Sequence, residues 1–342
     1  MRSFLRPAAG LTCLFAVAAA GCSAGSGGTS DAAPATPRQS TGTGSGSGAP
    51  SGTSYAPYVN AAEASADDTA GSPSAYNLAF VISGGSGCTP EWNGTRAVDD
   101  ATVAARVSAL TATGVPVRVS FGGASGRELA AVCGSVAELA EAYGAALDAA
   151  DSTRADFDIE GEELADAGSV ALRSRAIAAL QEERPDLEVS FTLPVMPSGL
   201  DSDGLALLTS ANTYDVQVSA VNLMTMNYGE SYAGDMGGYA VTAATAAHAQ
   251  LKEVFGTTDA AAWKGMALTS MIGVNDVAGE TFTLADAARV RAFAEEKGVS
   301  WVSMWSAFRD RRCEEGTDAD DALTDCSGVE QEPGAFAEAF SG

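Results

Sequence analysis

Histidine and basic residues are scarce in this sequence of 342 residues. It contains one histidine, His248, and 19 Lys and Arg residues against 44 Asp and Glu residues, which gives a formal net charge of −25. A single histidine excludes a zinc site with two histidine ligands. It also leaves a Ser or Cys triad no base but His248, which lies in an alanine-rich stretch typical of a helix surface. The acidic excess argues against nucleic acid and anionic lipid as partners and is compatible with a neutral polymer as substrate.

The N-terminal segment has only a short apolar run. Residues 11–20 are too few to span a bilayer as a permanent helix. Two arginines precede the run and Ala19-Ala20-Gly21-Cys22 ends it, a pattern typical of a secretory signal over residues 1–21. Small residues directly before a cysteine are similar to a lipobox, so we expect Cys22 to be lipidated and the protein to be extracellular, tethered to the cell membrane. The alternative is an ordinary secreted protein that is cut nearby, in which Cys22 is an incidental thiol.

Large apolar side chains are absent from residues 23–53, which consist mostly of Gly, Ser, Thr, Ala and Pro. Such a composition cannot bury a core, and it predicts a flexible tether over residues 22–53. Residues 54–342 are left to form one large domain.

Cysteine is also infrequent, with six in all, two of them among the first 22 residues. An even number of remaining cysteines in an exported protein predicts two disulfides. Of three possible pairings we favour the local closure Cys313–Cys326, which leaves Cys88–Cys133. The alternative is four buried free thiols. The acidic insert between Cys313 and Cys326 does not have the spacing of a calcium loop, and we predict no metal and no organic cofactor.

Apolar runs alternate with helix-like segments over about 290 residues, a repeat that predicts a (β/α)₈ TIM barrel in the α/β class. An open doubly wound sheet is the alternative, but no Gly-x-Gly-x-x-Gly follows the first run and the sequence contains no phosphate loop. The eight predicted strands are residues 55–59, 77–82, 117–121, 155–161, 188–193, 220–226, 264–268 and 300–305. The predicted helices are residues 99–113, 127–149, 167–183, 239–255 and 284–297.

The fourth predicted strand carries three acids at every second position, Asp156, Asp158 and Glu160, which alternate with Phe157 and Ile159. Side chains two apart share one face of a strand, so the acids form a file with steps of about 6.6 Å. Because the opposite face is apolar, we expect the strand to be buried on both sides. Burying like charges together raises at least one carboxyl pKa, as a general acid requires. The alternative is a solvated edge strand.

This stretch resembles the fourth-strand signature Asp-x-x-Asp-x-Asp-x-Glu of the glycoside hydrolase family 18 chitinases. Asp156, Asp158 and Glu160 match its last three acids, whereas Thr153 and Arg154 stand in place of the first acid and the glycine after it. The resemblance implies that Glu160 protonates the leaving oxygen and that Asp158 orients the acetamide of the substrate. It also implies that Asp156 shares a proton with Asp158.

Further motifs of the same family follow other predicted strands in the expected order. Met226 and Asn227 replace the Tyr and Asp of the family pattern, and we expect Tyr228 to share the strand face of Met226. Residues 271–276 follow the seventh strand and are expected to face the same end of the barrel. The likeness is strongest to the bacterial chitinase D-like branch. The substrate-binding residues that it implies are Ser120 and Gly122 of a Ser-x-Gly-Gly motif, Met224, Asn227 and Tyr228 after the sixth strand, and Trp305 in the eighth.

The resemblance implies a hydrolase of chitin or chitooligosaccharides in which the 2-acetamido group of the substrate is the nucleophile. We expect the protein to be a monomer. Two alternatives stay open at this stage. One is an endo-β-N-acetylglucosaminidase acting on other glycans, which would use the same acids. The other is a non-catalytic carbohydrate-binding barrel, which the departures at Thr153, Met226 and Asn227 keep open.

The lipidation of Cys22 is testable by cell fractionation. Replacing Cys22 with Ala should release the protein from the membrane fraction into the medium, because the acyl chains would have no attachment site. Immunoblots of the two fractions measure the change. A variant that stays with the membrane to the same extent as the unaltered chain would contradict the lipobox.

Overall fold

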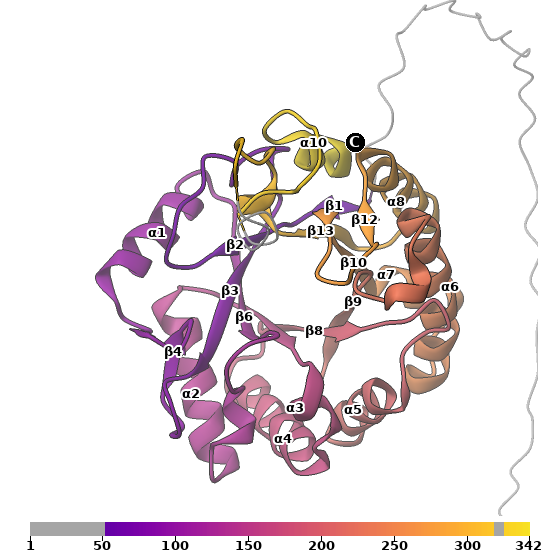
Figure 1. Cartoon of the computed structure of the whole chain (residues 1–342). Helices are drawn as coiled ribbons and strands as arrows, with labels where there is room; N and C mark the ends of the chain where they lie inside the picture. Colours follow the sequence, from indigo (N-terminus) through magenta and orange to yellow (C-terminus); the bar gives the residue numbers. More distant parts are fainter. Residues whose placement is uncertain (1–51, 318–324) are drawn as a thin grey trace, which may run out of the picture. The chain divides into compact units, whose positions relative to one another are not determined.

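Parallel strands with helices outside them form a ring (Figure 1). The structure is a computed structural model, and it describes residues 52–317 and 325–342. Each long strand pairs in parallel with the next one along the chain, which is the arrangement predicted from the alternating runs. These strands are β3 (Tyr76–Ser83), β6 (Val117–Gly122), β7 (Arg154–Asp158), β8 (Glu188–Pro194), β9 (Val218–Met224), β10 (Met266–Met271) and β13 (Trp301–Trp305).

The first barrel strand consists of two short pieces, β1 (Ser54–Tyr55) and β2 (Tyr58–Asn60). β1 pairs in parallel with β13, and β2 pairs in parallel with β3, so residues 54–60 join the two ends of the series. Pro57, which lies between the pieces, has no N–H to donate to a neighbouring strand. Its carbonyl accepts a bond of 2.9 Å from the Asn77 amide. The (β/α)₈ fold predicted from the sequence is confirmed.

Helices cover the outside of the strands, and several of them were not predicted. Asp201 caps α5 by accepting bonds from the Asp203 and Gly204 amides, and the predicted helix 127–149 is divided into η1 and α2. Lys264 ends α7, so it does not begin a strand. The helices are α1 (Ala101–Thr111), α2 (Val136–Ala149), α3 (Gly161–Ala165), α4 (Ala167–Glu183), α5 (Ser202–Thr213), α6 (Met236–Phe255), α7 (Asp259–Lys264), α8 (Leu284–Lys297) and α10 (Ala335–Ser341), with 3₁₀ turns η1 (Leu129–Ala131), η2 (Glu230–Tyr232) and η3 (Ala307–Arg309).

Short strands add to the ring at its edges. β4 (Pro90–Trp92) pairs antiparallel with β3 and with β5 (Arg96–Ala97). β11 (Gly273–Val274) and β12 (Thr281–Phe282) form a separate antiparallel pair after β10.

The apolar face of β7 packs outward against aromatic side chains. Phe157 is fully buried, and its ring centroid lies 5.3 Å from that of Phe121 on β6 and 4.9 Å from that of Tyr143 on α2. Ile159 is also buried. Alternation along the strand then turns Asp156 and Asp158 to the interior of the barrel. Asp156 and Asp158 therefore occupy a strand buried on both sides, as the apolar alternation predicted, but the strand ends at Asp158 and not at residue 161, so Glu160 lies beyond it.

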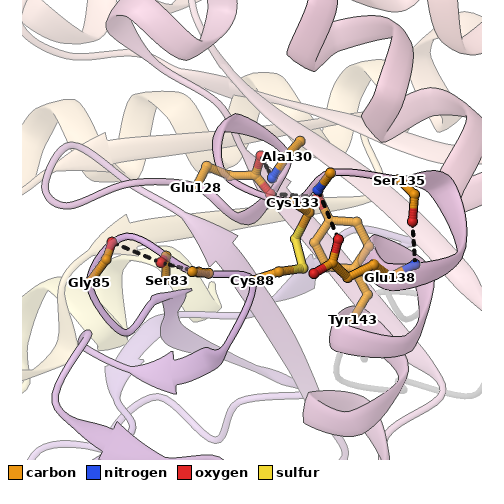
Figure 2. The surroundings of a disulfide bond; sticks show 11 residues. Ser83, Gly85, Cys88, Glu128, Ala130, Cys133, Ser135, Glu138 and Tyr143 are labelled. Carbon is orange, nitrogen blue, oxygen red and sulfur yellow. Dashed lines mark hydrogen bonds between the residues drawn. A yellow bond between two sulfur atoms is a disulfide. The ribbon is translucent and has the colours of Figure 1, made fainter.

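Two disulfides fix loops on this framework, with the pairing expected from the sequence. Cys88–Cys133 joins the loop after β3 to the end of η1, next to the Ser135 cap of α2 (Figure 2). Cys313–Cys326 closes the acidic insert in the C-terminal region.

The signal over residues 1–21, the lipidation of Cys22 and nearly all of the tether over 22–53 lie outside the described residues. In the described ranges, no helix has the length and apolar character needed to cross a membrane.

A buried ion pair ties the loop after β6 to the surrounding helices. Glu128 accepts bonds of 2.7 and 3.1 Å from Arg173 on α4 and one from the Tyr143 hydroxyl. Both charged side chains are nearly inaccessible to solvent. Arg184 and Asp148 form a pair of the same chemistry at 2.7 Å that is largely exposed.

Replacing Arg173 with Met should lower the free energy of unfolding by about 3–5 kcal/mol, because Glu128 would be left as an unpaired buried charge. Arg184→Met, the matched control, should cost at most about 1 kcal/mol, since solvent screens the exposed pair. Urea unfolding of the two variants gives both values. Equal losses would contradict the assigned role of burial.

Candidate active site

Asp156 is the centre of a hydrogen-bond network inside the barrel. The strand register places it beside Ser120 on β6 and Ser190 on β8. Its Oδ2 accepts bonds from the Tyr58 hydroxyl at 2.9 Å and from Ser120 at 2.7 Å. Its Oδ1 accepts bonds from Ser190 at 2.7 Å and from Thr192 at 2.8 Å. Four donors occupy both carboxyl oxygens, so the orientation of this side chain is fixed.

Asp158, one step further along β7, has fewer partners. It is buried, and its Oδ1 has no hydrogen-bond partner in the described structure. Burial raises the pKa of Asp158 well above its usual range, and the negative charges of Glu160 and Asp156 raise it further. The side chain therefore holds a proton to higher pH than an exposed aspartate does, and it keeps one oxygen available to a ligand.

Gly122 supports the backbone of Asp158 at close range. It has a φ of +101°, which favours glycine, and a Cβ there would overlap the Asp158 carbonyl oxygen. The amide of Gly123 donates a bond of 2.9 Å to that same oxygen. Gly122 thus lets β6 approach the Asp158 backbone closely, and Gly123 fixes that backbone with a hydrogen bond.

Glu160 lies just beyond the end of β7, at the start of α3. Burial raises the pKa of Glu160 above its usual value, and the negative charge of Asp276 raises it further. A carboxyl group with a raised pKa holds its proton closer to neutral pH, which suits a general acid.

Asp158 and Glu160 face one cavity of about 340 Å³ at the carboxyl ends of the strands. Aromatic rings form one of its walls, where Trp305 lies 5.4 Å from Phe80 in a stacked arrangement and 5.8 Å from Tyr58, centroid to centroid. Such a flat apolar surface fits the face of a sugar ring. The remaining lining residues include Thr192, Met196, Asp201, Met224, Met226, Asn227 and Asp276.

The cavity includes only part of the predicted substrate-binding set. Met224, Asn227 and Trp305 line it, whereas Ser120 lies beneath it on Asp156 and Gly122 acts through the backbone of Asp158.

Tyr228 is placed differently from the expectation. β9 ends at Met224, and Asn227 adopts a left-handed φ of +53°, so Met226 and Tyr228 do not share a strand face. Tyr228 is buried against Tyr232 and Tyr239 and is not among the residues that line the cavity. The sequence interpretation was wrong on this face because it extended the strand through residue 226.

Asp276 is a site residue that was not singled out from the sequence, although residues 271–276 were expected to face this end of the barrel. Asp276 lines the cavity, and its Oδ2 accepts a bond of 3.2 Å from the side-chain amide of Asn227. Asn227 stands where the family pattern has Asp, so a carboxylate from another loop is present beside that position. The sequence offered only one signal for Asp276 as a site residue, namely its position in a loop that follows a predicted strand.

In the portion of the chain that is described, no three His, Cys, Asp or Glu side chains are grouped as metal ligands.

No protein-family model matches this chain. Among solved structures, it is similar to active domain 2 of a chitinase from Pyrococcus furiosus, with 28% identity and a TM-score of 0.74 over 84% of this chain and 93% of that one. Solved chitinases of glycoside hydrolase family 18 share the fold at lower identity, among them one from Chromobacterium violaceum.

Two curated relatives are also chitinases by name. A probable bifunctional chitinase/lysozyme of Escherichia coli is 34% identical over 275 residues, which are 75% of this chain and 31% of the relative. Endochitinase 11 of Metarhizium anisopliae is 35% identical over 218 residues, which are 60% of this chain and 42% of the relative. The chain thus spans less than half the length of either relative.

The effect of Asp276 on Glu160 can be measured directly. Asp276→Asn should lower the pKa of Glu160, because a nearby negative charge that disfavours ionisation would be removed. Carbon-13 NMR titration of labelled glutamate carboxyls, assigned with Glu160→Gln, measures the shift. Asp201→Asn is the matched control: it also lines the cavity, and Asn can still cap α5. A Glu160 pKa that does not move in Asp276→Asn would contradict the assignment.

Proposed function

We propose that this protein is a glycoside hydrolase of the family 18 chitinase type, which cleaves β-1,4 bonds between N-acetylglucosamine units of chitin or chitooligosaccharides. One observation carries the proposal: Glu160 and Asp158, two carboxyl groups with raised pKa values, face the same aromatic-walled cavity. Two relatives named as chitinases, 34% and 35% identical over the aligned residues, support it, and so does a solved chitinase domain with the same fold.

In the first step, the acetamido oxygen of the sugar attacks the anomeric carbon and the glycosidic C–O bond breaks. The proton of Glu160 passes to the leaving oxygen, and the sugar becomes a cyclic oxazolinium ion. The unpartnered Oδ1 of Asp158 accepts the acetamide N–H and orients the nucleophile. As positive charge develops on the oxazolinium, the proton that Asp158 shares with Asp156 moves to Asp156, and the Asp158 carboxylate stabilises that charge.

In the second step, water attacks the anomeric carbon while Glu160, now a carboxylate, takes its proton. Burial and the nearby Asp276 disfavour the ionised form of Glu160, so both promote this proton uptake. The acetamide is released from the ring and the product has the configuration of the substrate. Asp156 makes no contact with the cavity in this scheme; it positions the file through its four hydroxyl donors.

We further propose that the protein acts outside the cell, anchored through lipidated Cys22 and the tether over residues 22–53. The signal-like pattern before Cys22 supports export. The two disulfides are also typical of an oxidising compartment. A tether of this length would let the anchored domain reach polysaccharide near the cell surface.

The proposal predicts that Glu160→Gln loses at least about 10²–10⁴-fold in hydrolysis of chitooligosaccharides, because the amide has no proton to give. Binding should persist in calorimetry, since the aromatic wall is unchanged. Glu162→Gln is the matched control, an exposed carboxylate two residues on that should hydrolyse at the original rate. Mass spectrometry of products from the full-length chain measures the rates.

Other outcomes of the same assay distinguish the alternatives. An unchanged rate in Glu160→Gln would refute the mechanism. An original chain that binds chitooligosaccharides without cleaving them would indicate a carbohydrate-binding barrel. Cleavage of a chitobiose-core glycan, with no cleavage of chitooligosaccharides, would indicate an endo-β-N-acetylglucosaminidase.

A further inference from the structure

A second cavity, of about 600 Å³, lies at the amino ends of the barrel strands. Residues at or near the starts of several strands line it, including Ser54, Arg118, Val189, Val218 and Ser300. The candidate active site is at the carboxyl ends of the same strands, so the two cavities occupy opposite ends of the barrel. Conserved chemistry in such barrels is placed at the carboxyl ends, and the proposed hydrolysis makes no use of this second cavity.

Arg118, on β6, is the unusual residue in this cavity. It is only 6% exposed, and its Nη1 donates a bond of 2.7 Å to the Asn77 side-chain oxygen. Its guanidinium carbon lies 4.3 Å from the centroid of the Trp301 ring. No carboxylate in the described residues is within ion-pair distance, and neither Nε nor Nη2 has a hydrogen-bond acceptor there. A buried charge without an ionic partner is unfavourable.

Several other buried arginines of this protein have carboxylate partners, whereas Arg309 is held by the backbone oxygens of Val274 and Cys326. Arg106 lies 2.7 Å from Asp68, and Arg173 lies 2.7 Å from Glu128, with both members of each pair buried. The fold thus provides carboxylate counter-charges for Arg106 and Arg173, two guanidinium groups buried to a similar extent. At Arg118 the space next to the group is an open cavity, where a counter-ion has room to bind.

The charged residues that line the cavity carry an excess of positive charge, although the buried Asp156 also acts on Arg118 from the barrel interior. Arg154 lies 3.1 Å from Glu188, and both line the cavity, so this pair largely cancels. Lys264, at the end of α7, also lines it and has no ion pair with any described residue. The indole N–H of Trp301 is a buried donor that lacks an acceptor in the described structure. Two unpaired cations and several free donors suit an anion with several oxygens.

We propose that this cavity binds a small oxyanion, of the phosphate, sulfate or carboxylate class, through the free Nε and Nη2 donors of Arg118. The planar guanidinium fork matches two oxygens of such an anion, and a charge-assisted pair of this kind is stronger than a neutral hydrogen bond. Lys264 adds a second positive charge at the rim. The bound anion stabilises the folded state, because it binds there and not to the unfolded chain.

Thermal unfolding of the full-length chain in sodium phosphate, against sodium chloride at equal ionic strength, tests this site. The expected result is a midpoint that rises and saturates with phosphate concentration. Arg118→Gln should weaken phosphate binding about tenfold or more, because it removes the charge and the fork together. Arg184→Gln is the matched control, an arginine paired with Asp148 and not among the lining residues, and it should leave the saturation curve unchanged.

Phosphate also stabilises proteins by exclusion from their surfaces, an effect that rises without saturation and is equal in all variants. That result alone would overturn the proposal. Should Arg118→Gln fail to fold, Arg118→Lys and the exposed Lys264→Gln replace it, and both should raise the phosphate dissociation constant. A constant unchanged in both would equally overturn it. This experiment does not measure hydrolysis. A negative result for phosphate binding therefore does not bear on the proposed glycosidase function, and a negative hydrolysis assay does not bear on phosphate binding.

Discussion

The burial of carboxyl groups inside the barrel is the constraint on which the site depends. Unpaired carboxylates are unfavourable in a protein interior, so each acid of the β7 file needs its own solution. Asp156 is satisfied by four hydroxyl donors from β2, β6 and β8. Asp158 and Glu160 lack such donors, and their pKa values rise. The same burial that fixes one acid therefore prepares the other two to hold protons.

The inward face of β6 serves both ends of the barrel. Arg118, Ser120 and Gly122 alternate along it, and each acts at a different depth. Arg118 lines the cavity at the amino ends, Ser120 donates to Asp156, and Gly122 gives room to the Asp158 backbone. The charge of Asp156 also favours the charged form of Arg118, whose pKa burial lowers. The positive charge of Arg118 thus lies towards the amino ends of the strands, and the negative charge of Asp276 lies at their carboxyl ends, with the acidic file between them.

Regular patterns in the sequence predicted the regular parts of the structure. The alternation of apolar runs is enough to predict the barrel, and the period-two acids are enough to predict one inward face, because both follow from local periodicity. Spatial neighbours that are far apart in the sequence were not predictable in this way. Asn227 and Asp276, 49 residues apart, meet only in the folded chain. Tyr228 was misplaced because the left-handed turn at Asn227 has no clear signal in a single sequence.

The central claim is that Glu160 protonates the leaving oxygen while the acetamide of the substrate supplies the nucleophile. The anomeric configuration of the first product tests it most directly, because double displacement through an oxazolinium ion keeps the β configuration. Proton NMR during the first minutes of chitooligosaccharide hydrolysis, before mutarotation, distinguishes the two anomers. The account predicts that the β anomer appears first. An initial α anomer would show inversion by direct attack of water and would contradict it.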